Sequence, residues 1–119
     1  MRITTPAFLI AFAWLALSQA LAADIRVGAT VQVQPNSIWF EDTAKLTQWQ
    51  RLKAGGNAAA LASYESKALA SREAWQFTGS LAVKVLAHDP AKKQVSVEMQ
   101  TEGRLIGTKW VIDAGTLAP

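Results

Sequence analysis

Apolar and polar residues alternate along the last third of the chain, a pattern typical of strands with one buried and one solvated face. The apolar positions of two successive runs are Leu81, Val83, Val85, Val95, Val97 and Met99. Asp89 and Pro90 between the runs favour a turn, because Asp bonds its own backbone and Pro presets the required dihedral. After a second turn at residues 101–104, a third run at 105–112 has one apolar face, formed by Ile106, Trp110 and Ile112. The stretch from Leu81 to Ile112 predicts a three-stranded antiparallel meander.

The same alternation predicts an earlier strand over Asp24–Gln34. Its apolar positions are Ile25, Val27, Ala29, Val31 and Val33. Pro35 ends this strand because it lacks the backbone donor that a sheet ladder needs. Ile38–Phe40 then forms an apolar cluster. We expect this cluster to lie in a loop that either covers the core or contacts a partner.

Between this loop and the meander, the apolar spacing changes to that of helices. Residues 41–43 supply acidic and capping side chains where a first helix begins. Its apolar stripe consists of Leu46, Trp49 and Leu52. Gly55 and Gly56 end this helix, and an alanine-rich second helix follows over Ala58–Ser71. The pattern predicts a pair of helices within residues 42–71.

Trp75–Phe77 returns the chain to β structure, and Asp113–Leu117 predicts a tight turn that places Leu117 on the core. The expected order is one strand, two helices and four β segments, without an internal repeat or an interdomain linker. The predicted fold class is therefore mainly β (α+β). Residues 23–119 are long enough for a single domain only.

The first 22 residues have the tripartite pattern of a cleaved secretory signal peptide. Arg2 precedes an apolar run over residues 7–17, and the small residues Ala20 and Ala22 lie before the expected cleavage point. The run is shorter than the roughly 20 residues that span a bilayer. We therefore expect a periplasmic or secreted protein with no membrane span after cleavage.

Charge and cysteine content narrow the class of partner. The 119 residues include 12 basic and 9 acidic side chains, a net charge of +3, and loss of Arg2 with the signal leaves +2. This mild balance, with Lys92–Lys93 as the only local basic pair, does not indicate nucleic-acid binding. The chain has no cysteine, so an exported domain must be stabilised by its core rather than by disulfides.

Several short strands, a long excursion after the first, a central meander, and the tail Trp110–Ile112 followed by a small turn and Leu117 resemble SH3-like barrels. The resemblance covers Val27–Leu117 at the level of the fold superfamily. It implies a small barrel of about five strands with a two-helix insertion after the first strand. In such barrels the excursion after the first strand and its aromatics often form a groove for a peptide or glycan chain, which here corresponds to residues 35–72.

The titratable residues do not form a recognisable catalytic set. His88 is the only histidine, and a zinc site or a nucleophilic pair lacks its other members. We interpret His88 as an exposed turn residue. Glu98 and Glu102 are the carboxylates that a glycoside hydrolase would use, but Glu98 alternates outward like an ordinary solvated side chain. We therefore expect a protein that is not an enzyme and has no catalytic residues, no cofactor and no metal site.

The aromatic residues are the best candidates for binding. Trp49 and Trp110 lie on apolar faces and are expected in the core. Trp39 and Phe40 are adjacent in the predicted loop and cannot easily both point inward, so we predict that they bind a partner. Arg104, in the second turn of the meander, is a candidate polar contact to the same surface.

The predicted function is a small exported module that binds a protein or cell-envelope component through the aromatic loop and the neighbouring groove. One alternative is a periplasmic inhibitor or immunity protein that blocks a hydrolase. A less favoured alternative is a carboxylate-dependent hydrolase that uses Glu98 or Glu102. An edge strand of a small open barrel can also pair between copies, so a homodimer is a further expectation.

Overall fold

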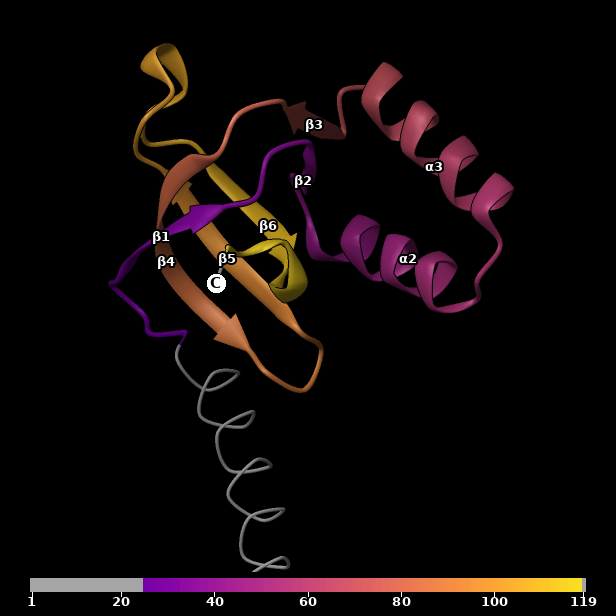
Figure 1. Cartoon of the computed structure of the whole chain (residues 1–119), viewed down its shortest axis with the longest axis horizontal. Coiled ribbons are helices and arrows are strands. Elements are labelled where there is room, and N and C mark those ends of the chain that lie inside the picture. Colours follow the sequence, from indigo (N-terminus) through magenta and orange to yellow (C-terminus); the bar gives the residue numbers. More distant parts are fainter. Residues whose placement is uncertain (1–24, 119) are drawn as a thin grey trace, which may run out of the picture.

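The computed structural model of the chain describes residues 25–118. The predicted signal peptide, residues 1–22, lies outside the described residues. The elements in chain order are β1 (Thr30–Val33), β2 (Ser37–Phe40), α2 (Thr43–Ala54), α3 (Ala58–Ala70), β3 (Ala74–Phe77), β4 (Leu81–Asp89), β5 (Gln94–Met99), the 3-10 turn η1 (Gly103–Leu105), β6 (Lys109–Asp113) and the 3-10 turn η2 (Ala114–Thr116) (Figure 1). The fold is α+β, as the sequence predicts at the coarse level.

The six strands form one antiparallel open sheet in the order β1-β4-β5-β6-β2-β3. The prediction of about five strands with the two helices after the first strand is therefore wrong. The sheet has six strands, and the helices follow the second strand. No closed barrel is found within residues 25–118. Among these residues, no helix is both long enough and apolar enough to cross a bilayer.

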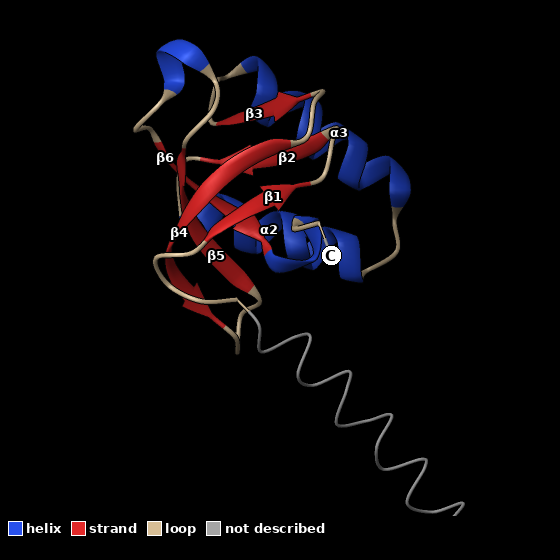
Figure 2. Ribbon diagram, turned by 60° about the vertical axis from the view of Figure 1, so that its left-hand side comes forward, coloured by secondary structure: helices blue, strands red, loops and turns tan. Residues whose placement is uncertain are grey.

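The open sheet is nevertheless strongly curved. A flat sheet would hold β1 and β2 about 19 Å apart, because four strand spacings separate them in the sheet order. Only Gln34–Asn36 links Val33, the end of β1, to Ser37, the start of β2, and four residue steps span at most about 14 Å. The sheet must therefore bend so that its two outer parts approach each other, and Figure 2 shows the strands curving in this way.

The first strand is shorter than the alternation predicts. Val27 and Gly28 form a turn in which Gly28 has a φ of +90°, and Val27 is 67% exposed. Backbone bonds from Gly28 N–H to Val85 O and from Val85 N–H to Ala29 O continue the contact with β4 beyond the regular ladder. Glycine adopts this positive φ readily, and the chain turns there. Regular β1 therefore begins only at Thr30.

The prediction of a loop at Ile38–Phe40 is wrong, because these residues form β2. Asn36 has a φ of +62°, and its N–H donates to Phe77 O at 2.8 Å, which starts the new strand at once. β2 pairs with β3 on one side and with β6 on the other. All four of its residues are buried, since it is covered on both faces.

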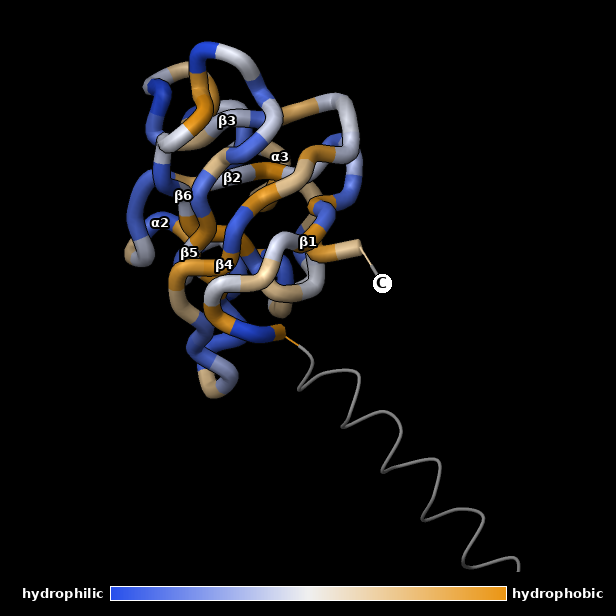
Figure 3. The backbone as a smooth tube through the Cα atoms, turned by 90° about the vertical axis from the view of Figure 1, so that its left-hand side faces the viewer, coloured by the Kyte–Doolittle hydropathy of each residue, from blue (hydrophilic) through white to orange (hydrophobic). Residues whose placement is uncertain are grey.

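One apolar core lies on the concave face of the curved sheet. Its buried members come from five strands and are Val33, Trp39, Val83, Val85, Val95, Val97, Met99, Trp110 and Ile112. Leu117 packs against this core, as the sequence predicts, and forms an isolated antiparallel bridge with Val33. Figure 3 shows the hydrophobic segments gathered along β4 and β5, the strands that supply most of this core.

A second core lies between the helices and the other face of the sheet near β2. It consists of Ile38, Phe40, Leu46, Trp49, Ala68, Ala74 and Val111, with Leu61, Tyr64 and Leu69 at its margin. Both predicted helices are confirmed, and both begin at a side-chain cap. Asp42 accepts a hydrogen bond from Lys45 N–H at 2.8 Å, and Asn57 accepts one from Ala60 N–H at 3.0 Å.

The meander is confirmed, with two local departures. The β4–β5 ladder shifts register between Val85 and Ala87, which is a β-bulge. The third strand starts at Lys109 rather than at residue 105, because η1 and a turn come first. Ile106 is consequently 57% exposed instead of facing the core.

Candidate functional site

Trp39 and Phe40, the predicted binding residues, are both fully buried. They point to opposite faces of β2, so Trp39 enters the concave core and Phe40 enters the helix-side core. Trp39 Nε1–H donates to Ser37 Oγ at 2.9 Å, and Ser37 in turn donates to Gln34 O. The expectation that adjacent aromatics cannot both be buried is wrong here, because both faces of β2 are covered.

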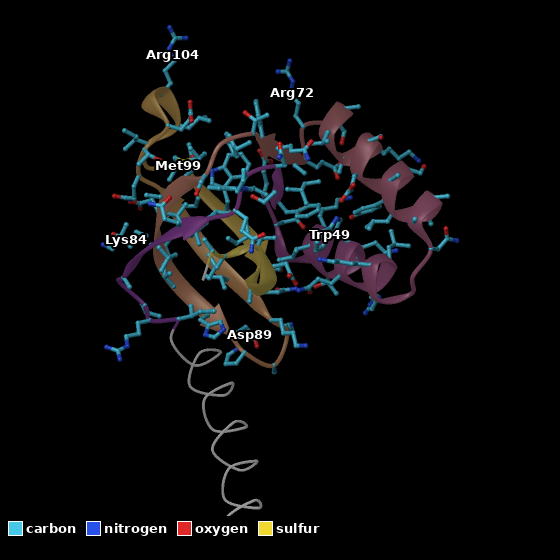
Figure 4. All side chains as sticks on the ribbon, viewed as in Figure 1. Trp49, Arg72, Lys84, Asp89, Met99 and Arg104 are labelled. Carbon is cyan, nitrogen blue, oxygen red and sulfur yellow. The ribbon has the colours of Figure 1, made fainter. Side chains whose placement is uncertain are left out.

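Arg104 lies at the exposed tip of the β5–β6 connection, in η1. Figure 4 shows its side chain pointing away from the sheet, at the far end of the molecule from Asp89. Because Trp39 and Phe40 are inside the two cores, the structure does not bring Arg104 together with them on one surface.

The residues weighed for catalysis lie apart from one another. His88 is near the end of β4 and, with Asp89 and Lys92, lines a shallow hollow of about 170 Å³. Glu98 lies on the convex face of β5, between Lys84 on β4 and Lys109 on β6. Glu102 precedes η1 and is exposed. Neither glutamate lines this hollow or the larger one described next.

A larger hollow of about 230 Å³ opens between the two helices and the link from β1 to β2. Its walls come from five parts of the chain. They are Gln34–Ile38 at the link, Trp49 and Lys53 on α2, Glu65 on α3, Gln76 on β3, and Gly115–Thr116 in η2. Most of these side chains carry amides, hydroxyls or charges, so the hollow presents hydrogen-bonding groups rather than an apolar surface.

The indole of Trp49 positions the two charged groups of this hollow. Its Nε1–H donates to Glu65 Oε2 at 2.7 Å, and Lys53 Nζ lies 4.9 Å from its ring centroid. A carboxylate bound to the indole edge and an ammonium over its face are both favoured by the charge distribution of the ring. Because Trp49 is only 5% exposed and packs on Phe40, it holds Glu65 and Lys53 on a rigid base.

The floor of the hollow is fixed by hydrogen bonds of the β1–β2 link. Gln34 Nε2–H donates to Leu117 O at 3.1 Å, and Gln76 Nε2–H donates to Asn36 O at 3.0 Å. These bonds connect η2, the link and β3. The lining groups are therefore held in place before any ligand arrives, which lowers the entropy cost of binding.

A second polar cluster joins α2 to α3 and to Glu73, the residue before β3. Lys45 Nζ lies 2.9 Å from Glu73 Oε2, and the hydrogen bond and charge of Glu73 raise the pKa of Lys45 above its usual value. Tyr64 Oη–H donates to Lys45 O at 3.0 Å. Burial raises the pKa of Tyr64, because it disfavours the phenolate. These groups hold β3 against the helices.

The sequence identified Trp49 only as a core residue and did not single out Lys53, Glu65 or Gln76. Lys53 lies four residues after Trp49 on α2, a spacing that places both on one helix face. The partner Glu65 comes from another helix, so no local signal reveals it. Within residues 25–118, no group of three or more His, Cys, Asp or Glu side chains is arranged to hold a metal ion.

Comparisons of the chain with protein-family models, with curated proteins and with solved structures find no match.

Proposed function

We propose that this protein is an exported, non-enzymatic binding module that recognises a protein partner through the hollow between the helices and the β1–β2 link. The observation that carries the proposal is the pair of opposite charges, Lys53 and Glu65, held by Trp49 at the wall of a polar hollow. A polar loop of a partner can place a charged side chain against one of these groups and bond its backbone to the amides around them.

A protein loop fits this hollow better than a glycan chain. Sugar-binding sites commonly stack the ring on an exposed aromatic face, whereas Trp49 is 5% exposed and has Lys53 over its ring. Ile38 and Pro35 provide only a small apolar contribution to the lining. The groups that remain accessible are amides, hydroxyls and charges, which match peptide bonds and polar side chains.

The finer architecture is also part of the proposal. We interpret the curved sheet as an SH3-like barrel with β2, α2, α3 and β3 inserted after its first strand. Support comes from the order of the remaining elements: β1, the meander β4–β6, the 3-10 turn η2, and Leu117 returning to bridge Val33. Export rests on the signal-like pattern of residues 1–22.

A photo-crosslinking residue placed at Asn36, on the exposed rim of the hollow, tests the proposal in cells of the source organism. We expect one discrete crosslinked protein, which is lost when Lys53→Glu reverses the charge beside Glu65. The matched control carries the crosslinker at Lys84, on the convex face of the sheet, and should not give this product.

Identical products at positions 36 and 84, or no product at position 36, would contradict the proposal. Crosslinking only to cell-wall material would replace the protein partner with an envelope component. A crosslinked hydrolase whose activity falls at a one-to-one ratio would refine the module to an inhibitor.

A further inference from the structure

Among residues 25–118, no strand pairs with the outer edge of β3. In this part of the chain, β3 is the last strand in the sheet order and pairs with β2 alone (Figure 2). Natural proteins protect such edges with charged side chains, with proline or with a bulge. Residues 74–83 contain no charged residue and no proline, and the β2–β3 ladder runs without a register shift. Only the short length of β3 limits pairing with another strand.

The ladder determines which backbone groups of β3 face outward. Opposite residues in an antiparallel pair alternate between hydrogen-bonded and non-hydrogen-bonded positions. Glu41 N–H donates to Glu73 O at 3.2 Å, so Trp75, two residues later, also bonds inward to its opposite residue Trp39. The N–H and C=O groups of Ala74 and Gln76 therefore point to the open edge.

We propose that two copies of this chain pair β3 to β3, antiparallel, about a two-fold axis at Trp75. In this register Ala74 of each copy lies opposite Gln76 of the other, so the outward donors and acceptors of both residues bond to each other. The sheets of the two copies then form one continuous sheet of twelve strands. This inference is independent of the hollow and of its proposed partner.

Trp75 favours this register because it lies opposite its own copy at a non-hydrogen-bonded position. Side chains are closest at such positions, with Cα atoms about 4.5 Å apart, and aromatic pairs there stabilise the sheet. Trp75 is 39% exposed, while its ring already packs edge-on against Trp110 at 6.2 Å between centroids. Because the buried Trp110 holds the exposed indole of Trp75 in place, Trp75 is preorganised to contact Trp75 of the second copy.

The charges next to β3 also permit this pairing. In the proposed register Glu73 lies opposite Phe77 of the second copy, and Arg72 lies opposite Thr78. No two like charges face each other across the axis. Two four-residue strands bury less than the roughly 1,200 Å² of a standard stable interface. We therefore expect a concentration-dependent dimer with a dissociation constant of roughly 10 µM to 1 mM.

Sedimentation of the wild-type protein, lacking residues 1–22, measures the equilibrium directly. We expect the weight-average mass to rise from monomer toward dimer between 10 µM and 1 mM, on the order of the expected dissociation constant. Hydrogen exchange of the Gln76 amide should slow over the same range, because this N–H becomes bonded. A monomer at all concentrations, with unchanged exchange at Gln76, would overturn the proposal.

Single-cysteine variants test the register, since the chain has no cysteine of its own. With oxidised glutathione as the electron acceptor, Trp75→Cys should form a disulfide-linked dimer at least tenfold faster than Gln76→Cys. The two copies of residue 76 would lie about 8 Å apart, beyond disulfide reach. Ile106→Cys, exposed but away from β3, is the matched control. Equal rates for all three variants would reject the two-fold axis at Trp75.

Discussion

The two outer strands of the sheet differ in what covers them. On β1, Gln34 N–H donates to Thr116 O and Ala118 N–H donates to Gln32 O, both at 2.8 Å, while Leu117 bridges Val33. The chain thus covers this edge with its own last residues. Beyond β3 the described part of the chain adds no further strand, and Trp75 remains partly exposed. Within residues 25–118, the chain thus covers one outer edge of the sheet and leaves the other edge open.

Two tryptophans that lie opposite each other in the β2–β3 ladder should differ most in their contribution to stability. Trp39 is fully buried among Trp110 and Phe77, whereas Trp75 is 39% exposed. We expect Trp39→Ala to lower the free energy of unfolding by about 4 kcal/mol, because it leaves a large cavity. Trp75→Ala should cost about 1.5 kcal/mol or less. Urea denaturation of both variants measures the difference, and equal losses would show that β3 is part of the main core.

An intermediate effect is expected when the closed edge is opened. A chain truncated after Gly115 loses the backbone bonds to Gln34 and Gln32 and the packing of Leu117. We expect a loss of about 3 kcal/mol in the free energy of unfolding. The truncated chain should also form species larger than a dimer, because it then has two bare edges. Unchanged stability and mass would mean that the C-terminal residues do not protect β1.

The smallest effect is a loss of stability at alkaline pH. The pKa values of Lys45 and Tyr64 are both raised in the folded protein, above ordinary values of 10.5 and 10.0. The folded state therefore binds more protons above about pH 10, and its stability falls as pH rises through the folded pKa values. Denaturation midpoints at pH 9 and pH 11 should show a smaller drop in Lys45→Met and Tyr64→Phe than in the wild type.

Local patterns predicted the meander, both helices and the cap of the first helix well. Alternation at Val83, Val95 and Val97 reflects a period of two that survives folding unchanged. The same rule failed at Val27, because one glycine with a positive φ turned the chain before the strand began. It also missed that Ile38–Phe40 is a strand. A run that is buried on both faces shows no alternation. Ile38–Phe40 is buried on both faces because helices formed by later residues pack on β2.

The candidate site was less predictable than the fold. The sequence indicates Trp39 and Phe40 as binding residues because two adjacent aromatics rarely share one buried side. The helices that cover Phe40 provide a second buried side, so both residues lie inside. The charged pair at the hollow joins Lys53 and Glu65 from different helices through the indole of Trp49. Such a set depends on tertiary packing, so spacing along the chain cannot reveal it.

Residues 34–80 begin and end at neighbouring positions of the sheet, because Val33 lies directly opposite Leu81 in the β1–β4 ladder. An engineer could join these two neighbours with a short turn and delete everything between them. The remaining chain would keep the meander but would lose Trp39 and Phe77, which fill its interior. We conclude that residues 34–80 supply part of the core. The sheet therefore needs this segment in order to fold, although the chain could be joined without it.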